Sequence, residues 1–334
     1  MILILSEEND YATNDVIDWL RYYGIRFFRI NESDSIRIID WQMKESVFEF
    51  DIEVSSPYYS SPKKISSKEI SAYWYRRGFL NIRGGYVPMP TYYNEKLNRV
   101  IQRINCHLRD ENMRIVDFLH FYFGTIKHIG CFYENLRINK MKNLYLAKEC
   151  GIKIPDFIVT SSKKQALLFV EQHPICVVKG IEDNSLTIKG LVSMGNLAKL
   201  ITKDSVSEFP DKFDYSLIQE YIDKKVDLRV FFLDGKAIPT AIFSQNDPQT
   251  RVDFRNYNQE RPNRIVPFKM TKSDEEKLQT LMRKLNYVSG SIDYVLDAQN
   301  NLIFLEINPI GQFGFISNKC NLYIPKSIAE YFTI

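Results

Sequence analysis

The chain has 334 residues, of which 45% are hydrophobic and 25% charged, so it is long enough for two or three small domains of an ordinary globular protein. Its net charge of +3 is too small to indicate general nucleic-acid binding, and no run approaches the ~20 apolar residues of a membrane span. The first residues, MILILSEEND, lack the basic and apolar regions of a signal peptide, and the five scattered cysteines form no CxxC, so we expect reduced thiols and a cytoplasmic protein.

Residues 1–125 are predicted to form an N-terminal α/β domain. A short buried strand over 2–5 is followed by a helix over 14–23, which ends at Gly24, and by a strand over 25–30. This order and spacing indicate a parallel sheet with a right-handed crossover. The later elements expected in this domain are two strands, a loop between them rich in Ser, Pro and Lys, and a long helix, over 47–54, 71–75, 55–67 and 92–122.

Residues 126–214 are predicted to form a small central domain, which opens with a helix over 141–150 closed by Gly151. The elements that follow are a strand, a helix, a strand and two short strands, at 157–160, 163–172, 175–179, 186–188 and 191–193. The remainder of this domain, 194–214, is expected to be a helix or loop followed by a polar turn.

Residues 215–334 are predicted to form a C-terminal domain that consists mainly of β-strands. Asp234-Gly235 between two apolar runs is a strong signal for a type I′ hairpin. The elements expected here are five strands and one helix, at 215–222, 226–233, 236–243, 291–297, 302–307 and 273–285.

The last two strands are predicted to form a hairpin around the loop Ala298-Gln299-Asn300-Asn301. Residues at equal distances from this loop face each other, which sets Asp293 opposite Glu306, with Asn308 on the same face. Like charges in opposed positions destabilise a ladder, so a cation between them is expected, and three oxygen ligands suit Mg²⁺ that carries nucleotide phosphates. The alternative, a solvated strand end, fits less well because the neighbouring residues look buried.

Two lysines could hold phosphates. Lys179 ends the apolar strand ICVVK, and Lys140 begins a helix, where the helix dipole already favours anions. Either lysine alone could be an ordinary surface lysine, but the two together could bind a polyphosphate.

The segment Gln219-Glu220-Tyr221-Ile222 ends a strand at the second domain boundary, where its main-chain groups could read the edge of an adenine. On the next strand Asp227 and Arg229 share one face. Asp227 could accept from ribose hydroxyls and Arg229 could meet a phosphate or carboxylate. The alternative is an ion-pair ladder on an exposed strand.

Arginines are concentrated in two further places. The segment RVDFRNYNQERPNR, residues 251–264, holds four of them among amide side chains, and Arg76-Arg77 follow the strand SAYWY. Arginine binds carboxylates and phosphates with two parallel hydrogen bonds, so both places could face an anionic ligand. The alternative is solvated basic loops.

Other chemistries lack their motifs. The chain has no P-loop, no GxGxxG after its first strand, and no HExxH, GxSxG or kinase signature. The histidines are dispersed and are predicted to be structural: His107, His120, His128 and His173.

In chain order these motifs resemble the ATP-grasp ligase family, over the whole chain. The most specific pieces are LEINP with Asp293 upstream, and NKMKNLYLAKECGIKIPDFIVT, which is similar to the ribosomal-protein glutamate ligase branch. YWYRRG, VDLRVFFLDGK and VDFRNYN resemble the graspetide synthetases, peptide maturases of the microviridin and grasp-with-spasm groups. The resemblance implies an α/β ATP-grasp fold in which the three predicted domains are a pre-ATP-grasp domain, a central lid-type domain and a C-terminal grasp domain.

The resemblance also implies ATP and Mg²⁺ as cofactors and assigns roles to matching positions. Nucleotide binding is expected from Lys140, Lys179, Gln219, Glu220, Tyr221, Ile222, Asp227 and Asn256. Mg²⁺ is expected on Asp293, Glu306 and Asn308, and catalytic roles are expected for Arg255, Arg229 and Lys179. An acidic core peptide is expected to meet Arg76, Arg77, Arg251 and Arg264.

The activity that the resemblance implies is ATP-dependent macrocyclisation of a ribosomal precursor peptide with a leader and an acidic core. The resemblance also suggests a homodimer. Side chains of Asp or Glu would be activated as acyl phosphates and joined to Ser or Thr hydroxyls or Lys amines. One departure concerns the segment after Lys179, GIEDNSLTIKG, which lacks the glycine-rich lid loop of amino-acid ligases in this family. The rival hypotheses are an intermolecular ligase that adds amino acids to an acid, and a non-catalytic binding module on the same scaffold.

Overall fold

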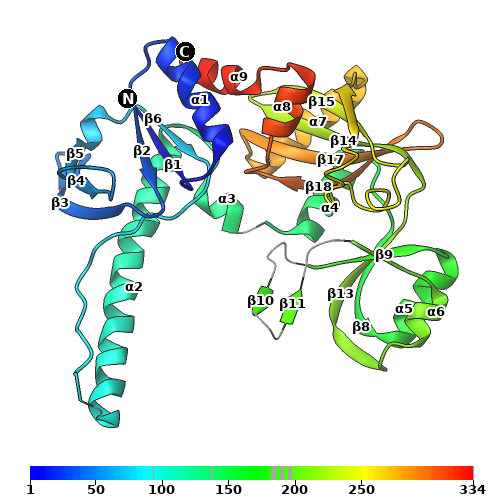
Figure 1. Ribbon diagram of the computed structural model, residues 1–334, viewed down its shortest axis with the longest axis horizontal. Helices are drawn as coiled ribbons and strands as arrows, with labels where there is room; N and C mark the ends of the chain where they lie inside the picture. The colour runs from blue at the N-terminus through cyan, green and yellow to red at the C-terminus, as the bar shows by residue number, and fades with distance from the viewer. Residues whose placement is uncertain (93, 137, 182–185, 189–191, 195–197, 334) are drawn as a thin grey trace. The chain divides into compact units, whose positions relative to one another are not determined.

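A computed structural model describes the chain apart from residues 93, 137, 182–185, 189–191, 195–197 and 334 (Figure 1). The chain divides into two compact units, Met1–Leu136 with Ile324–Ile334, and Arg137–Tyr323. The boundary predicted at residue 125 therefore lies before the end of the first unit, and the last residues of the chain return to that unit. The boundary predicted at residue 214 falls inside a strand of the second unit.

The first unit contains a parallel sheet in the order β2-β1-β6-β7. Its strands are β1 Ile2–Ser6, β2 Phe27–Asn31, β6 Ala72–Tyr75 and β7 Lys127–Ile129. The helix α1 (Tyr11–Tyr22) connects β1 to β2 and buries Val16, Ile17 and Leu20. The predicted parallel strand–helix–strand arrangement is confirmed.

A second sheet of this unit is antiparallel and was only partly predicted. It consists of β3 Ser35–Lys44, β4 Val47–Ser55 and β5 Lys63–Ser66. Of these strands only β4 was expected. The segment that forms β5 was predicted to be part of a loop, because its sequence KKIS has one buried residue, Ile65, and no alternating pattern. Aromatic rings join the sheet to the long helix α2 (Glu95–Thr125), for example Phe48 and Phe118 with 4.8 Å between ring centroids.

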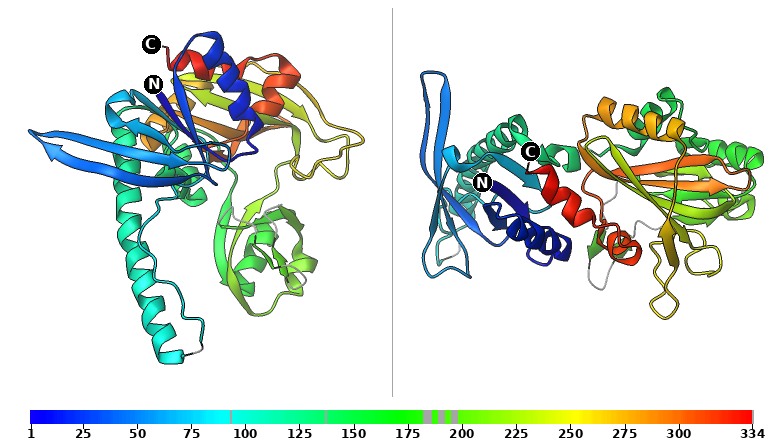
Figure 2. Two further views of the ribbon diagram at one scale, coloured as in Figure 1. Left: turned by 60° about the vertical axis from the view of Figure 1, so that its left-hand side comes forward. Right: turned by 90° about the horizontal axis from the view of Figure 1, so that it is seen from above.

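The chain's last helix, α9 (Ile324–Tyr331), lies beside α1 in Figures 1 and 2. The Tyr23 hydroxyl at the end of α1 donates to the Glu330 carboxylate at 3.0 Å. The remaining helices of the first unit are short, η1 Ser67–Glu69 and α3 Phe132–Leu136. None of the helices in the described part of the chain is long and apolar enough to cross a bilayer.

The second unit begins with α4 (Lys140–Glu149) and continues into an antiparallel sheet in the order β12-β9-β13-β8. Its strands are β8 Phe157–Ser162, β9 Cys176–Lys179, β12 Lys199–Ile201 and β13 Lys212–Glu220. The helices α5 (Lys163–Gln172) and α6 (Lys203–Ser207) share one core with this sheet, which includes Phe169 and Ile218. The short strands β10 Leu186–Ile188 and β11 Val192–Met194 pair with each other.

A five-stranded antiparallel sheet, in the order β16-β15-β14-β17-β18, forms the rest of the second unit. Its strands are β14 Lys224–Leu233, β15 Lys236–Phe243, β16 Arg264–Pro267, β17 Ser289–Asp297 and β18 Leu302–Asn308. Helices α4 and α7 (Lys272–Leu285) supply apolar side chains to its core, and α8 (Gly314–Cys320) follows β18. Asp234 and Gly235 have φ of 45° and 81°, as the predicted type I′ turn between β14 and β15 requires.

Candidate active site

The hairpin of β17 and β18 places Asp293 opposite Glu306 and Ser291 opposite Asn308, as predicted. The predicted loop, however, is one residue too short. Leu296 pairs with Leu302, so Asp297, the last residue of β17, has no opposite residue on β18, and its carboxylate accepts from the Asn301 main-chain N–H at 2.7 Å. A β-bulge then shifts the register between Asp293 and the next residue along β17, and this shift restores the pairing that the shorter loop would have given.

Two arginines meet the opposed carboxylates. Arg229, directly across from Asp293 on β14, donates through Nη1 to both carboxylate oxygens at 2.8 Å. Arg255 donates through Nη1 to Glu306 Oε1 at 3.2 Å. The partner of Arg229 is therefore Asp293 on the neighbouring strand. The alternative interpretation, an ion-pair ladder along one strand, would have paired Arg229 with Asp227.

The charges around the two carboxylates shift their pKa values in opposite directions. Burial raises the pKa of Asp293 despite Arg229, and the charge of Glu306 adds to this effect. Burial also acts to raise the pKa of Glu306, but the cations Lys179 and Arg255 outweigh it and lower that pKa below its ordinary value. Glu306 is thus held as an anion in a cationic surrounding.

Oxygen atoms suited to a hard cation gather at this end of the hairpin. Asp293 is buried, Glu306 is partly buried and Asn308 is exposed, with its Oδ1 accepting from the Ile310 main-chain N–H at 2.9 Å. Two carboxylates and a carboxamide on one face are a donor set that fits Mg²⁺, which prefers oxygen ligands and keeps several waters.

The two predicted lysines lie in the same electrostatic field as Glu306. Lys140, at the start of α4, is 7% exposed and donates through Nζ to the Gly180 carbonyl at 2.9 Å, next to Lys179. Burial lowers the pKa of the Lys179 ammonium, Glu306 raises it, and Lys140 and Arg255 lower it further. The structure therefore brings Lys140, Lys179, Arg255 and Glu306 together, although they come from separate segments.

The linker after β13 has part of its hydrogen-bonding capacity already in use. The Glu220 N–H donates to the Asp156 carbonyl at 2.9 Å, and the Tyr221 N–H donates to the Ile175 carbonyl at 3.0 Å. The Asp156 N–H donates to the Glu220 side chain at 3.2 Å instead of to the Glu220 main chain. The Glu220 carbonyl oxygen is thereby left without this donor.

Asp227 is held by partners within the protein. It is 4% exposed, and its Oδ1 accepts from Lys224 Nζ at 2.6 Å while its other oxygen accepts from the Ser244 hydroxyl. Burial raises its pKa against the effect of Lys224. The carboxylate is enclosed by groups of the protein itself, so a structural role is the alternative to the predicted ribose contact, which stays a prediction.

Asp253 is a site residue that the sequence analysis missed. Its carboxylate accepts from Arg255 Nε at 2.9 Å and from Arg255 Nη2 at 2.7 Å, and it also accepts from the Ala198 N–H at 3.4 Å. Burial lowers the pKa of Arg255, but Asp253 and Glu306 outweigh it and raise that pKa above its ordinary value. The signal was present in VDFRNYN, where an acid stands two residues before the arginine.

A family model described as the RimK-like ATP-grasp domain matches residues 137–332, which is more than half of the chain. The chain belongs to the RimK-like ATP-grasp family. The predicted family and the predicted α/β ATP-grasp fold are confirmed.

Solved structures similar to this ATP-grasp chain include three ligases. A RiPP-associated ATP-grasp ligase of Chryseobacterium gregarium, in complex with ADP and a leader and core peptide, has a TM-score of 0.77 at 20% identity and covers 99% of this chain and 94% of its own. Macrocyclase MdnC of Microcystis aeruginosa MRC, bound with precursor peptide MdnA, has a TM-score of 0.73 at 19% identity, with 100% and 99% covered. The ligase PsnB, complexed with minimal precursor, Mg and ADP, has a TM-score of 0.69 at 13% identity, with 99% and 96% covered. At these identities the likeness is one of fold.

Among curated proteins, the alpha-aminoadipate–LysW ligase LysX of Sulfurisphaera tokodaii is 28% identical over 193 residues. The alignment covers 52% of the ATP-grasp chain and 60% of the relative. The chain thus spans less than two thirds of the length of this relative.

The remaining predicted residues of the ATP-grasp chain divide by exposure. Arg76, predicted to meet an acidic core peptide, is buried in an ion pair with Asp10 at 2.8 Å, so its guanidinium already has an acidic partner within the protein. Arg77, Arg251 and Arg264 keep partly or fully exposed side chains, and the Asn256 amide donates to the Gln249 carbonyl at 3.0 Å. The departure from a glycine-rich lid concerns a segment that falls largely on residues 182–185 and 189–191, outside the described residues.

Proposed function

We propose that this ATP-grasp chain is an ATP-dependent ligase that forms rings within a ribosomally made precursor peptide. The observation that supports this best is the gathering of Lys140, Lys179, Arg255 and Glu306 in one cationic site. The chain shares its fold, over nearly its whole length, with ligases solved together with leader, core or precursor peptides. We infer a peptide substrate on that basis.

Different residues would contact different parts of the nucleotide. Lys140 and Lys179 would neutralise its phosphates, and the Glu220 carbonyl with the Ile222 N–H would contact the adenine edge. Gln219 and Tyr221, on either side of Glu220, would hold the linker in place. Asn256, next to Arg255, would lie at the phosphates.

Asp293, Glu306 and Asn308 would hold Mg²⁺. When bound, Mg²⁺ neutralises charge on the phosphates and keeps them in line for transfer. Arg229 would keep the buried Asp293 ionised through its paired hydrogen bonds, because an unpaired carboxylate there would favour its protonated form.

The reaction follows from the poor reactivity of a carboxylate. An oxygen of an Asp or Glu side chain of the core peptide attacks the γ-phosphorus of ATP, the bond to ADP breaks, and an acyl phosphate forms. Arg255 would stabilise the charge that develops on the transferred phosphoryl group. A hydroxyl or amine of the same peptide then attacks the acyl carbon, loses its proton, and releases phosphate. The ring is an ester or an amide, and its formation removes the elements of one water from the peptide.

The acidic core would meet exposed arginines, for which we propose Arg77, Arg251 and Arg264. A leader segment of the precursor would bind elsewhere on the chain. We further propose a cytoplasmic enzyme that acts on peptide and not on nucleic acid or membrane, with a homodimer as the assembly to test.

A second candidate is an intermolecular ligase that joins an amine to a free acid or to a protein. The similarity to the alpha-aminoadipate–LysW ligase favours it, because that relative is named as a ligase of alpha-aminoadipate with LysW. A non-catalytic binding module is a weaker candidate, because the chain keeps both lysines and all three proposed metal ligands.

Mass spectrometry of a neighbouring acidic precursor peptide, after incubation with the protein, ATP and Mg²⁺, tests the proposal. We expect the loss of one water mass per ring, absent with Glu306→Ala and retained with the matched control Glu276→Ala on the exposed surface of α7. ADP release only when free amino acids are added would support the intermolecular ligase. The absence of both signals would contradict both ligase proposals.

A further inference from the structure

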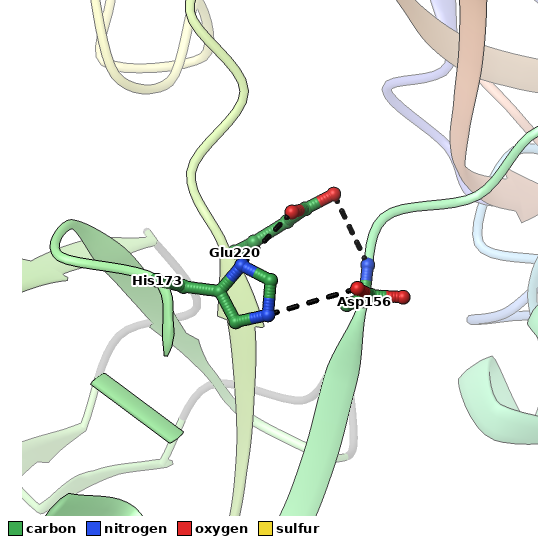
Figure 3. A group of neighbouring side chains, drawn as sticks. All are labelled: Asp156, His173 and Glu220. Atoms are coloured by element: carbon green, nitrogen blue, oxygen red, sulfur yellow. Dashed lines mark hydrogen bonds and ion pairs between the residues drawn. The ribbon is translucent and has the colours of Figure 1, made fainter. Parts of the chain in front are cut away.

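Asp156, His173 and Glu220 form a cluster outside the proposed phosphate and Mg²⁺ site (Figure 3). They come from three segments: Asp156 precedes β8, His173 follows α5, and Glu220 ends β13. One ligand atom from each residue lies within 4.8 Å of the others. No sequence motif brings these residues together, so only the fold creates the cluster.

The imidazole of His173 stands between the two carboxylates. Its Nδ1 lies 3.1 Å from Glu220 Oε2, and its Nε2 lies 3.6 Å from Asp156 Oδ2. Figure 3 shows the ring with one nitrogen directed to each acid. Each ring nitrogen therefore has a carboxylate beside it. A cation bound to one ring nitrogen would meet the carboxylate on that side in place of an N–H proton.

The backbone around the cluster is well fixed. Glu220 and Asp156 are joined by two hydrogen bonds, one between main-chain atoms at 2.9 Å and one from the Asp156 N–H to Glu220 Oε1 at 3.2 Å. The His173 and Glu220 side chains are 19% and 25% exposed, whereas that of Asp156 is 72% exposed. Two ligands are thus held in place, and the third can turn toward them at low cost.

We propose that Asp156, His173 and Glu220 bind a divalent cation of the zinc class. An imidazole nitrogen and carboxylate oxygens are common Zn²⁺ ligands, and bonds of about 2.1 Å in a tetrahedron place ligand atoms about 3.4 Å apart. The 3.1 Å between His173 Nδ1 and Glu220 Oε2 is close to that length. The 3.6 Å to Asp156 Oδ2 is measured from the other ring nitrogen, Nε2, so the Asp156 carboxylate must turn to reach an ion on Nδ1. The site would hold the ion through Glu220 Oε2, one ring nitrogen and a rotated Asp156 carboxylate, with water completing the set.

The ligand chemistry separates this site from the proposed Mg²⁺ site. Imidazole suits zinc-class ions, whereas Mg²⁺ prefers oxygen ligands alone. Cys176 is close by, and its thiol donates to the His173 carbonyl at 3.2 Å. Burial raises the pKa of that thiol to about 11, and the proposed site does not use Cys176 as a ligand.

A bound ion would tie the start of β8, the end of α5 and the end of β13 to one point beside the linker that we propose for adenine. It would stabilise the folded chain in proportion to its affinity, because the unfolded chain does not hold the three ligands together. Since Glu220 contributes a side-chain oxygen, the ion would also fix the residue whose carbonyl we propose as an adenine contact, a consequence that rests on the proposed function.

Isothermal titration of the full chain with Zn²⁺, in buffer with millimolar Mg²⁺ and no nucleotide or peptide, tests the site apart from any activity. We expect one ion per chain with a Kd of about 10 μM or tighter. His173→Ala and Asp156→Ala should each weaken binding at least about tenfold. The matched control His107→Ala, which removes a 73% exposed histidine of the first unit, should leave it unchanged.

Unchanged zinc affinity in Asp156→Ala and His173→Ala, or displacement of Zn²⁺ by Mg²⁺, would overturn the proposal. Thermal unfolding of each variant without metal shows whether it folds. If His173→Ala does not fold, Asp156→Ala decides the question, because its side chain is mostly exposed. The proposed ligase function can fail without affecting this result, since the titration uses no substrate.

Discussion

Arg255 donates to Glu306 through Nη1 and to Asp253 through Nε and Nη2. The arginine is therefore oriented by an acid of its own loop toward an acid that we propose as a metal ligand. Such a fixed cation can meet phosphoryl oxygens without reorganising, which is how preorganised charge accelerates a reaction.

Arg255→Lys should keep the charge and lose the paired geometry. We expect kcat to fall about a hundredfold, because a lysine cannot hold Asp253 and Glu306 at once. The measurement is the steady-state rate of ADP release with precursor peptide. The control Arg261→Lys changes an exposed arginine of the same segment and should keep the wild-type rate; an equal loss in both variants would contradict the assigned role.

Asp253→Asn tests positioning through Arg255. The amide can no longer accept two charged hydrogen bonds, so we expect kcat to fall about tenfold while the KM for ATP stays near the wild-type value. Asp253→Glu should recover part of the loss. A rise in the KM for ATP with unchanged kcat would instead indicate that Asp253 touches the nucleotide.

Asp227→Asn distinguishes a structural from a nucleotide-binding role. It leaves the Lys224 ammonium buried without its acid, so we expect a loss of about 3 kcal/mol in the free energy of unfolding. Denaturant unfolding measures this change. If the variant keeps its stability and only the KM for ATP rises, Asp227 serves the ribose after all and the assignment made from the structure is wrong.

His120 makes the stability of the first unit depend on pH. Burial lowers its pKa to about 4, and its ring stacks on Phe132 at 4.2 Å. Between pH 6.5 and pH 4 the unfolded chain binds a proton on this histidine and the folded chain does not. The free energy of unfolding therefore has its full value above pH 6.5 and decreases as the pH falls toward 4.

Wild-type protein should therefore lose about 2 kcal/mol of unfolding free energy from this group between pH 7 and pH 5. His120→Gln should remove that part of the pH dependence, whatever its effect at pH 7, and His107→Gln should not. Denaturant unfolding at both pH values gives the comparison. Parallel pH dependences of His120→Gln and wild type would contradict the prediction.

Local patterns predicted most elements of the fold because these elements follow apolar periodicity, helix caps and turn residues. The pairing of Asp293 with Glu306 was also predicted, although a longer turn and a bulge cancel each other to produce it. Patterns failed where pairing depends on distant segments. The strand β5 has one buried residue, and the burial of Arg76 depends on Asp10, which the sequence places far away.

The site shows the same division between local and distant information. The motif spacing identified Lys140, Lys179 and Glu306, whereas Asp253 and the ion pair of Lys224 with Asp227 appeared only in the structure. A buried acid can bind a ligand or a neighbouring cation, and its sequence context is similar in both cases. Only the position of the neighbouring cation separates the two roles.

The most direct measurement of the central claim follows oxygen-18 from the carboxylates of a labelled core peptide. Wild-type protein with ATP and Mg²⁺ should transfer one labelled oxygen to inorganic phosphate for each ring formed, and Glu306→Ala should transfer none. Label in AMP, or rings formed without labelled phosphate, would contradict an acyl phosphate formed at this site.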